Sequence, residues 1–339
     1  MWRIVFRALL AAIPAALFAV PAVLFAVPAV LFAVAAGAQE NFPTRSIRFI
    51  VPFAPGGPSD IVARIMAPRM QVALGQPVVV ENRVGAGGVT GVEALARAAP
   101  DGHTIAIASA GALAISPRLG RGTPYDPLRD LAAITLGVLV PEPLVVPAAL
   151  PIHSVADLVA AARARPGALN FASSGPGSMP HLAAEQLRAA AGIDITHVAY
   201  RGGAPLAMAV LQNEAQLGFA DLPILLPHIR AGTLRALAVG ASARLPWIPD
   251  VPTMAEVGLP AVDANNWHGI VAPARVPDAI LVRLHAAAAG ALRDPEVARL
   301  LTEQGAIPGG NSRAEFAAFI AAELEKWGAV IRAGNIQGE

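Results

Sequence analysis

The stretch IRFIVPFAPGGPSD, Ile47–Asp60, is the part of the chain from which the fold can first be inferred. It begins with the apolar, β-branched run Ile47–Val51, which is typical of a buried strand. Prolines and glycines end the run, and Ser59-Asp60 stands at the N-cap position before a helical pattern over Ile61–Leu74. A strand, a glycine-rich turn and a helix N-terminus together present unpaired N–H groups that attract anions. The glycines could equally serve only to form a βα turn.

The same strand–turn–helix unit recurs along the chain. Further strands are predicted at Val78–Val80, Thr104–Ala108, Leu169–Ala172, Thr196–Tyr200 and Leu217–Ala220. This alternation indicates an α/β fold with mostly parallel, helix-covered sheets. The apolar stretches Leu131–Val146 and Leu234–Val239 are interpreted as two crossings between two doubly wound lobes. We therefore expect lobe 1 over residues 39–140, lobe 2 over 141–239, and a return to lobe 1 with C-terminal helices over 240–339.

The N-terminus has the pattern of a targeting segment. Arg3 and Arg7 precede an apolar tract from Ala8 to Ala36, and small residues follow it. We predict a signal peptide over residues 1–38 with cleavage after Ala38, and hence export to the periplasm. Because the tract is long enough to span a bilayer, an uncleaved anchor is the alternative. Prolines recurring every seven residues would kink such a helix.

Composition and motifs exclude several kinds of site. The formal net charge is +1 and no basic patch is visible, which argues against nucleic acid as a partner. The chain has no cysteine, and Lys326 is its only lysine, so it has no P-loop. A dinucleotide motif beginning at Gly85 fails because Thr90 stands where glycine is required. The histidines lack metal-ligand spacing, so we predict neither a cofactor nor a metal.

What these exclusions leave is a set of glycine- and serine-rich turns at helix N-termini, contributed by both lobes. Such turns bind a small anion through backbone N–H groups and hydroxyls without transforming it. His181, in the first turn of a predicted helix, could bond a ligand or pack locally. Asp60 could likewise touch a ligand or cap its own helix. Trp267 is expected in the core rather than in a cleft.

Eight ordered motifs resemble one known family, the Bug-type extracytoplasmic substrate-binding receptors of the tripartite tricarboxylate transporter system. They are PFAPGGPSD (52–60), GQPVVVENRVGAGG (75–88), PDGHT (100–104), PYDPLRD (124–130), NFASSGPGS (170–178), HVAYRGGAP (197–205), LPHIRAGTLRALAV (226–239) and DVPTMAEVGLP (250–260). The resemblance implies a periplasmic-binding-protein-like fold whose two lobes close like a Venus flytrap on a small carboxylate. It also implies a receptor, not an enzyme, that delivers its ligand to membrane permease subunits.

The family pattern implies a set of ligand-binding residues drawn from both lobes. They are Phe53, Pro55, Gly56, Gly57, Ser59, Asp60 and Ser109 on one side, and Ser173, Ser174, Gly175, Ser178, His181, Tyr200, Gly202, Gly203, Ala204 and Asp221 on the other. Members usually hold carboxylates through loop backbone and bridging water. Pro58, Met179-Pro180 and the order Phe219-Ala220-Asp221 depart from the family pattern and bear on which ligand is bound.

We therefore expect a periplasmic receptor for a small mono- or dicarboxylate, monomeric, with hinges near Leu139 and Val239. Ligand binding would shift an equilibrium between open and closed lobes. Two alternatives stay open on the sequence alone. One is a ligand-dependent receptor for a membrane sensor, and the other is an α/β hydrolase that uses Ser174 or Ser178 with His181.

Overall fold

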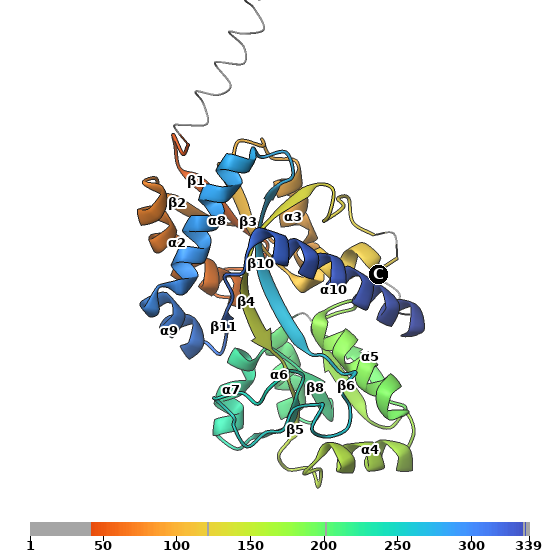
Figure 1. Ribbon diagram of the computed structural model, residues 1–339. Coiled ribbons are helices and arrows are strands. Elements are labelled where there is room, and N and C mark those ends of the chain that lie inside the picture. Colours follow the sequence, from red (N-terminus) through yellow and green to blue (C-terminus); the bar gives the residue numbers. More distant parts are fainter. Residues whose placement is uncertain (1–41, 121, 201, 335, 337–339) are drawn as a thin grey trace, which may run out of the picture. The chain divides into compact units, whose positions relative to one another are not determined.

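The structure is a computed structural model that describes residues 42–120, 122–200, 202–334 and 336. The predicted signal peptide and its cleavage after Ala38 lie outside the described residues. Contacts divide the chain into two units, Met1–Thr44 and Arg45–Glu339. The second unit contains both sheets and is described here by itself (Figure 1).

The first sheet, with the helices that cover it, is called lobe 1. Its six strands have the order β11-β4-β10-β3-β1-β2. β1 pairs in parallel with β2 and β3, whereas β10 pairs antiparallel with β3 and β4. The bounds are β1 Ile47–Val51, β2 Val78–Asn82, β3 Thr104–Ser109, β4 Leu131–Pro141, β10 Asn265–Pro273 and β11 Ile307–Pro308. Every residue of β3 is buried, as expected for a central strand covered on both faces.

Within the described residues, five α-helices belong to lobe 1. α2 and α8 pack side by side, and Phe316 of α10 lies against Gly269 of β10. Trp267 meets Phe316 and Phe319 edge-on, with ring centroids 5.9 and 5.1 Å apart, which confirms its predicted place in the core. The bounds are α2 Pro58–Leu74, α3 Val89–Ala96, α8 Asp278–Arg293, α9 Pro295–Glu303 and α10 Arg313–Gly334. Short helical turns lie at η2 Ala86–Gly88, η3 Gly111–Ile115 and η4 Ser116–Arg118.

The second sheet and its helices are called lobe 2. Its strand order is β7-β6-β8-β5-β9, with β6 parallel to β7 and β8, and β5 antiparallel to β8 and β9. Apolar residues on both faces form its core. The bounds are β5 Pro143–Pro147, β6 Asn170–Ser173, β7 Thr196–Ala199, β8 Leu217–Phe219, β9 Leu234–Val239, α4 Val155–Ala164, α5 Met179–Ala191, α6 Gly203–Leu211 and α7 Leu222–Arg230.

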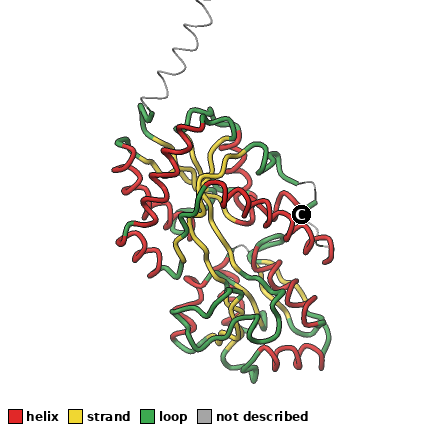
Figure 2. Tube along the Cα trace, viewed as in Figure 1, coloured by secondary structure: helices red, strands yellow, loops and turns green. Residues whose placement is uncertain are grey.

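The lobes are joined where β4 passes into β5 and where the segment after β9 enters β10. β4 and β10 form a long antiparallel ribbon that runs from lobe 1 toward lobe 2 (Figure 2). Only Glu142 separates β4 from β5, and its N–H donates to the carbonyl of Ala264. The α/β architecture with two crossings is thus confirmed, but Leu234–Val239, expected to form the second crossing, is strand β9 of lobe 2, and the crossing follows it. The domain limits expected above, at residues 140 and 239, remain a prediction.

One local expectation needs correction. α2 begins at Pro58 with Gly57 as its N-cap residue, so Ser59-Asp60 lies inside the helix rather than before it. The physical reason is that proline fits the first helical position, because its missing N–H would be unpaired there anyway. The predicted end of this helix at Leu74 is confirmed.

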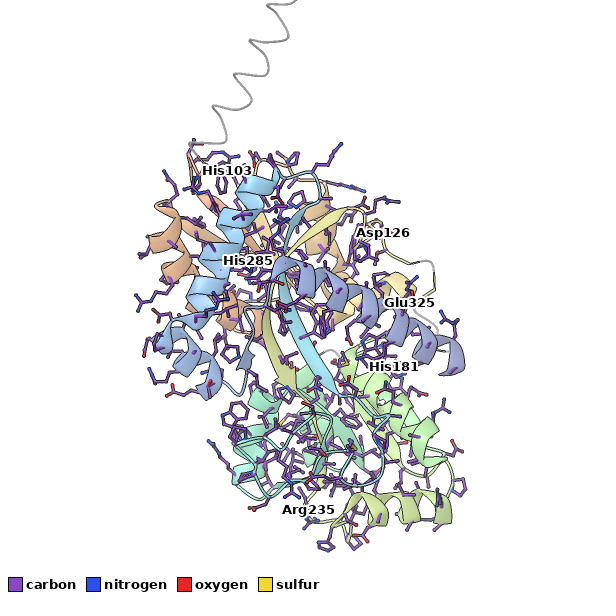
Figure 3. The ribbon with its side chains drawn as sticks, viewed as in Figure 1. His103, Asp126, His181, Arg235, His285 and Glu325 are labelled. Atoms are coloured by element: carbon purple, nitrogen blue, oxygen red, sulfur yellow. The ribbon has the colours of Figure 1, made fainter. Side chains whose placement is uncertain are left out.

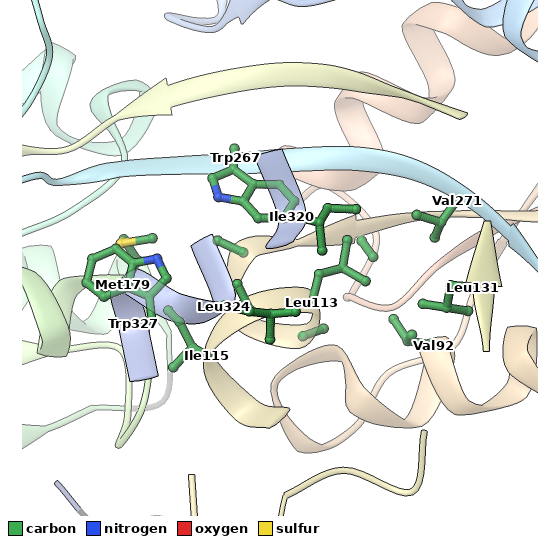
Figure 4. Close-up of a cluster of buried hydrophobic side chains, with 14 of the residues drawn as sticks. Val92, Leu113, Ile115, Leu131, Met179, Trp267, Val271, Ile320, Leu324 and Trp327 are labelled. Atoms are coloured by element: carbon green, nitrogen blue, oxygen red, sulfur yellow. The ribbon is translucent and has the colours of Figure 1, made fainter. Parts of the chain in front are cut away.

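An apolar cluster crosses from lobe 2 to lobe 1. Met179 and Leu182 of α5 belong to the same buried cluster as Ile115, Leu324 and Trp327 (Figure 4). The buried carboxylate of Glu323 accepts hydrogen bonds from two indole N–H groups, at 2.8 Å from Trp267 and 2.9 Å from Trp327. α10 therefore contacts both β10, through Trp267, and α5.

Candidate functional site

The loop between β1 and α2 is held by the carboxylate of Asp60. Its Oδ2 accepts the N–H of Gly56 at 2.9 Å and Nε of Arg64 at 2.8 Å. Its Oδ1 accepts Nδ2 of Asn82 at 2.9 Å, and the same amide donates to the carbonyl of Phe53. Burial acts to raise the pKa of Asp60, but these hydrogen bonds outweigh it and leave the pKa below its usual value. Asp60 therefore stays ionised and shapes the glycine turn.

The three loops that follow β1, β2 and β3 touch one another. A methyl group at Gly88, in the loop after β2, would lie 3.2 Å from Cζ of Phe53 and 3.5 Å from Cβ of Ala112. Gly88 has φ of 102°, a value that favours glycine. Pro55 and Gly56 are exposed, and Gly57 and Phe53 are partly exposed. The tip of the loop after β1 is thus exposed to solvent.

Beneath them, Ser59 meets a histidine that the sequence reading did not select. Ser59 Oγ lies 3.1 Å from Nδ1 of His268, and both side chains are buried. Ser109 is paired in register with His268 across β3 and β10. Burial lowers the pKa of His268 to about 4, so its ring is neutral near pH 7. Nε2 of His268 is one of the buried polar atoms without a partner among the described residues.

In lobe 2, the segment Ser173–Ser178 forms the corresponding loop between β6 and α5. Ser173 Oγ accepts the N–H of Gly175 at 3.1 Å, and Ser178 Oγ donates to the carbonyl of Gly175 at 2.7 Å. Gly175 and Gly177 have φ of 124° and 71°, which favour glycine. Ser174, Gly175 and Ser178 are partly exposed, whereas Ser173 is fully buried. We call this segment the Ser173–Ser178 loop.

This loop meets lobe 1 directly. A methyl group at Gly177 would overlap Cδ1 of Leu119 and lie 3.9 Å from Cγ2 of Ile115, both in the segment that follows β3. The loops after β3 and β6 therefore adjoin, although one belongs to each lobe.

His181 stands one helical turn beyond the Ser173–Ser178 loop, at the start of α5 (Figure 3). It is 7% exposed, and its Nδ1 accepts the N–H of Gly177 at 3.1 Å. Burial, with smaller contributions from His197 and Arg188, lowers its pKa to about 4. The hydrolase alternative placed His181 beside Ser174 or Ser178, yet its Nδ1 is engaged by the backbone, and Ser178 donates to a carbonyl.

The remaining predicted residues lie around the starts of α6 and α7. Tyr200 bonds the carbonyl of Ser173 through its N–H, and its hydroxyl lies 3.3 Å from Oε2 of Glu214. Gly202 has φ of 112° and precedes α6, whose first residue is Gly203. A methyl group at Gly203 would overlap Ile224 of α7, so the two helix starts are adjacent. Ala204 is exposed in the first turn of α6.

Asp221 precedes α7 and is bonded into the crossing between the lobes. Its Oδ1 accepts Nδ2 of Asn266 at 3.1 Å. The buried carboxyl of Glu142 forms a hydrogen bond with Asp221. Burial raises the pKa of Glu142 well above its usual value and raises that of Asp221 to about 6, although hydrogen bonds from Asn266 and Glu142 oppose the latter shift. A proton shared by the two carboxyl groups explains both directions.

The predicted residues do not all have the same role in the structure. Ser59, Asp60, Ser109, Ser173 and His181 are buried, and the side chains of Asp60, Ser173 and His181 hold the loops by accepting backbone N–H groups. Helix amides supply the anion-attracting groups, because the first backbone bonds of α2 and α5 are Ile61 N–H to Gly57 and Leu182 N–H to Ser178. Glu142, His197, Asn266 and His268 were missed, since each depends on contacts distant in sequence. Direct ligand contact by any of these residues remains a prediction.

Metal binding and membrane spanning are not supported in the described part of the chain. No group of three or more histidine, aspartate or glutamate residues there could hold a metal ion. Among residues 42–120, 122–200, 202–334 and 336, no helix has the length and apolar character needed to cross a bilayer.

Two α/β lobes linked by a two-stranded ribbon, with glycine-rich turns at helix N-termini in both, define a solute-binding receptor of the periplasmic type. A family model described as "Tripartite tricarboxylate transporter family receptor" matches residues 62–336. The chain belongs to this family, whose members are periplasmic receptors rather than enzymes.

Similar proteins agree with this assignment over most of the chain. Protein BugT of Bordetella pertussis is 39% identical over 294 residues, covering 86% of this chain and 90% of BugT. The solved structure of R. palustris Rpa4515 with adipate has a TM-score of 0.80 at 34% identity, covering 88% and 99% of the two chains. MatC from Rhodopseudomonas palustris with bound malate has a TM-score of 0.77 at 31% identity, covering 86% and 100%.

Proposed function

We propose that this receptor binds a small mono- or dicarboxylate between its two lobes and delivers it to the permease subunits of a tripartite tricarboxylate-type transporter. The observation that carries the proposal is a set of touching loops in front of two helix N-termini: the loop before α2 touches the loops after β2 and β3, and the segment after β3 adjoins the Ser173–Ser178 loop before α5. Such termini stabilise carboxylates through N–H groups and the helix dipole. The relatives solved with adipate and malate hold ligands of the same chemistry.

The first test is isothermal titration of the exported, ligand-free protein with a panel of organic acids that includes adipate and malate. Adipamide, which replaces both carboxylates with neutral amides, is the matched control compound. We expect saturable binding of at least one acid and none of adipamide. Folded protein that binds no acid of the panel would contradict the proposal.

A substitution at the N-cap residue of α2 tests the site itself. Gly57 has φ of −75°, which any residue can adopt, so Gly57→Asp would place a carboxylate at the α2 N-terminus without backbone strain. That carboxylate would compete with the ligand, and we expect affinity to fall at least about tenfold. Pro277→Asp places the same charge at the N-cap of α8 and serves as the control. Equal affinities of both variants would argue against ligand binding at α2.

We further propose that the receptor acts as a monomer and is exported by a cleavable signal peptide ending at Ala38. The n-region, apolar tract and small residues of the N-terminus support cleavage. N-terminal sequencing of the periplasmic protein should begin at Gln39. A start at Met1 in the membrane fraction would instead indicate the uncleaved anchor.

A further inference from the structure

The Ser173–Ser178 loop is bonded to two histidines that come from different elements of lobe 2. Nδ1 of His181, on α5, accepts the N–H of Gly177 at 3.1 Å. Nε2 of His197, on β7, lies 2.6 Å from Ser173 Oγ. Because Ser173 Oγ also accepts the N–H of Gly175, both glycines of the loop are connected to an imidazole, one of them directly.

The two imidazoles are themselves stacked. Their ring centroids are 4.0 Å apart and their planes differ by 8°, so the rings lie nearly parallel. Phe171 of β6 packs against both rings, with its centroid 4.8 Å from that of His197 and 6.1 Å from that of His181, at interplanar angles of 19° and 20°. Each ring therefore restricts the rotamer of the next, and the nitrogen atoms that meet the loop are held in place.

The protonation state is the one that the loop contact requires. With Nδ1 accepting from Gly177, the proton of neutral His181 resides on Nε2, 3.9 Å from Oε1 of Glu185. Burial lowers the pKa of both histidines, and Arg188 and His197 add to the effect at His181. A cationic His181 would lose its acceptor and face His197 at stacking distance, so the neutral pair is the stable one near pH 7.

We infer that His181 and His197 are positioning residues: they fix the Ser173–Ser178 loop in its ligand-binding conformation without contacting the ligand themselves. This inference rests on the proposed carboxylate-binding function. It changes the role predicted for His181 from ligand contact to loop support, and it gives His197 a role that its strand position alone does not suggest.

Matched substitutions at each histidine distinguish the effect of its hydrogen bond to the loop from the effect of its stacked ring. His181→Phe keeps a flat ring for stacking and removes the acceptor, whereas His181→Asn keeps an acceptor near the position of Nδ1. His197→Phe and His197→Gln make the same comparison for the contact between His197 Nε2 and Ser173 Oγ. Affinity for adipate and malate is measured by titration, and exchange of the Gly177 amide hydrogen is followed by NMR. Urea unfolding checks that each variant is folded.

We expect the two Phe variants to lose about tenfold or more in affinity, with the Asn and Gln variants within about threefold of the parent. Gly177 amide exchange should accelerate at least about tenfold in His181→Phe and far less in His181→Asn. Equal affinity and exchange in His181→Phe and the parent would overturn the inference, as would equal losses in His181→Phe and His181→Asn. Should the Phe variants fail to fold, Ser173→Ala tests the His197 arm, and unchanged affinity would overturn that part.

The exchange measurement also separates this inference from the proposed function. If the parent protein binds neither acid, the proposed ligand class fails. Gly177 exchange in the same variants still shows whether the histidines hold the loop. Binding by the parent with exchange unaffected in His181→Phe would leave the proposed function intact and refute the positioning role.

Discussion

Ser59 Oγ and Nδ1 of His268 lie 3.1 Å apart in the interior of lobe 1, although 209 positions separate them in the sequence. The contact joins the first turn of α2 to the ribbon that leads into lobe 2. It ties the helix N-terminus proposed to bind the ligand to one of the strands that connect the lobes.

His268 should make stability depend on acidity. Its pKa is about 4 in the folded protein and 6.5 ordinarily, so its contribution is complete above pH 6.5 and is lost as pH falls through 4. The loss amounts to roughly 3 kcal/mol, at about 1.4 kcal/mol per pKa unit. We expect His268→Asn, which keeps a polar group facing Ser59, to unfold in urea with a shallower dependence on pH between 7 and 4. The exposed His153→Asn is the control, and identical pH profiles of both variants would contradict the prediction.

The contribution of the Glu142–Asp221 carboxyl pair to folding stability should depend on pH in the opposite direction. Burial raises the pKa of Glu142, so its contribution is complete below its unfolded pKa and is lost as pH rises through the folded value. Glu142→Gln keeps a donor for Asp221 without a charge to bury. We expect it to be more stable than the parent by roughly 1–3 kcal/mol at pH 8, with the difference shrinking toward pH 4. A difference that grows as pH falls would show that the sign is wrong.

Gly177 should tolerate no side chain, for two separable reasons. Gly177→Ala suffers the strain of φ at 71° and would also push against Leu119. Gly192→Ala suffers only the first, because φ is 60° and no atom lies within 4 Å of the added methyl. We expect roughly 1–2 kcal/mol of destabilisation at Gly192 and roughly 1–3 kcal/mol more at Gly177. Leu119→Ala added to Gly177→Ala should recover part of the excess, as measured by urea unfolding; no recovery would place the clash elsewhere.

Glu323 should stabilise the protein as the hydrogen-bond acceptor of two buried tryptophans, Trp267 and Trp327. Glu323→Leu would leave the indole N–H groups of Trp267 and Trp327 buried without an acceptor and would remove one of the two carboxylate partners of Lys326, the other being Asp263. We expect a loss of roughly 2–5 kcal/mol and altered tryptophan fluorescence, whereas Glu323→Gln, which keeps an acceptor, should lose less. Equal losses in both variants would indicate that charge, rather than hydrogen bonding, is what the site requires.

Most strands, helices and glycine turns could be predicted from local pattern. Ile47–Val51 has the expected bounds, and the strands predicted at Thr104–Ala108 and Leu169–Ala172 lie within one residue of β3 and β6, because a strand buried on both faces is a nearly continuous apolar run. The start of α2 was misplaced because Ser59-Asp60 resembles an N-cap, while Pro58 at the first helical position sets the boundary.

By itself, then, the sequence determined the α/β class, the two crossings, the anion-attracting turns and the family, since each is written in neighbouring residues or in ordered motifs. Only the tertiary structure decided that Ser59, Ser173 and His181 face the interior. It alone brought His197 to the Ser173–Ser178 loop and Glu142 to Asp221. Local periodicity specifies which face of an element is buried, but which polar groups meet there depends on packing between segments far apart in the chain.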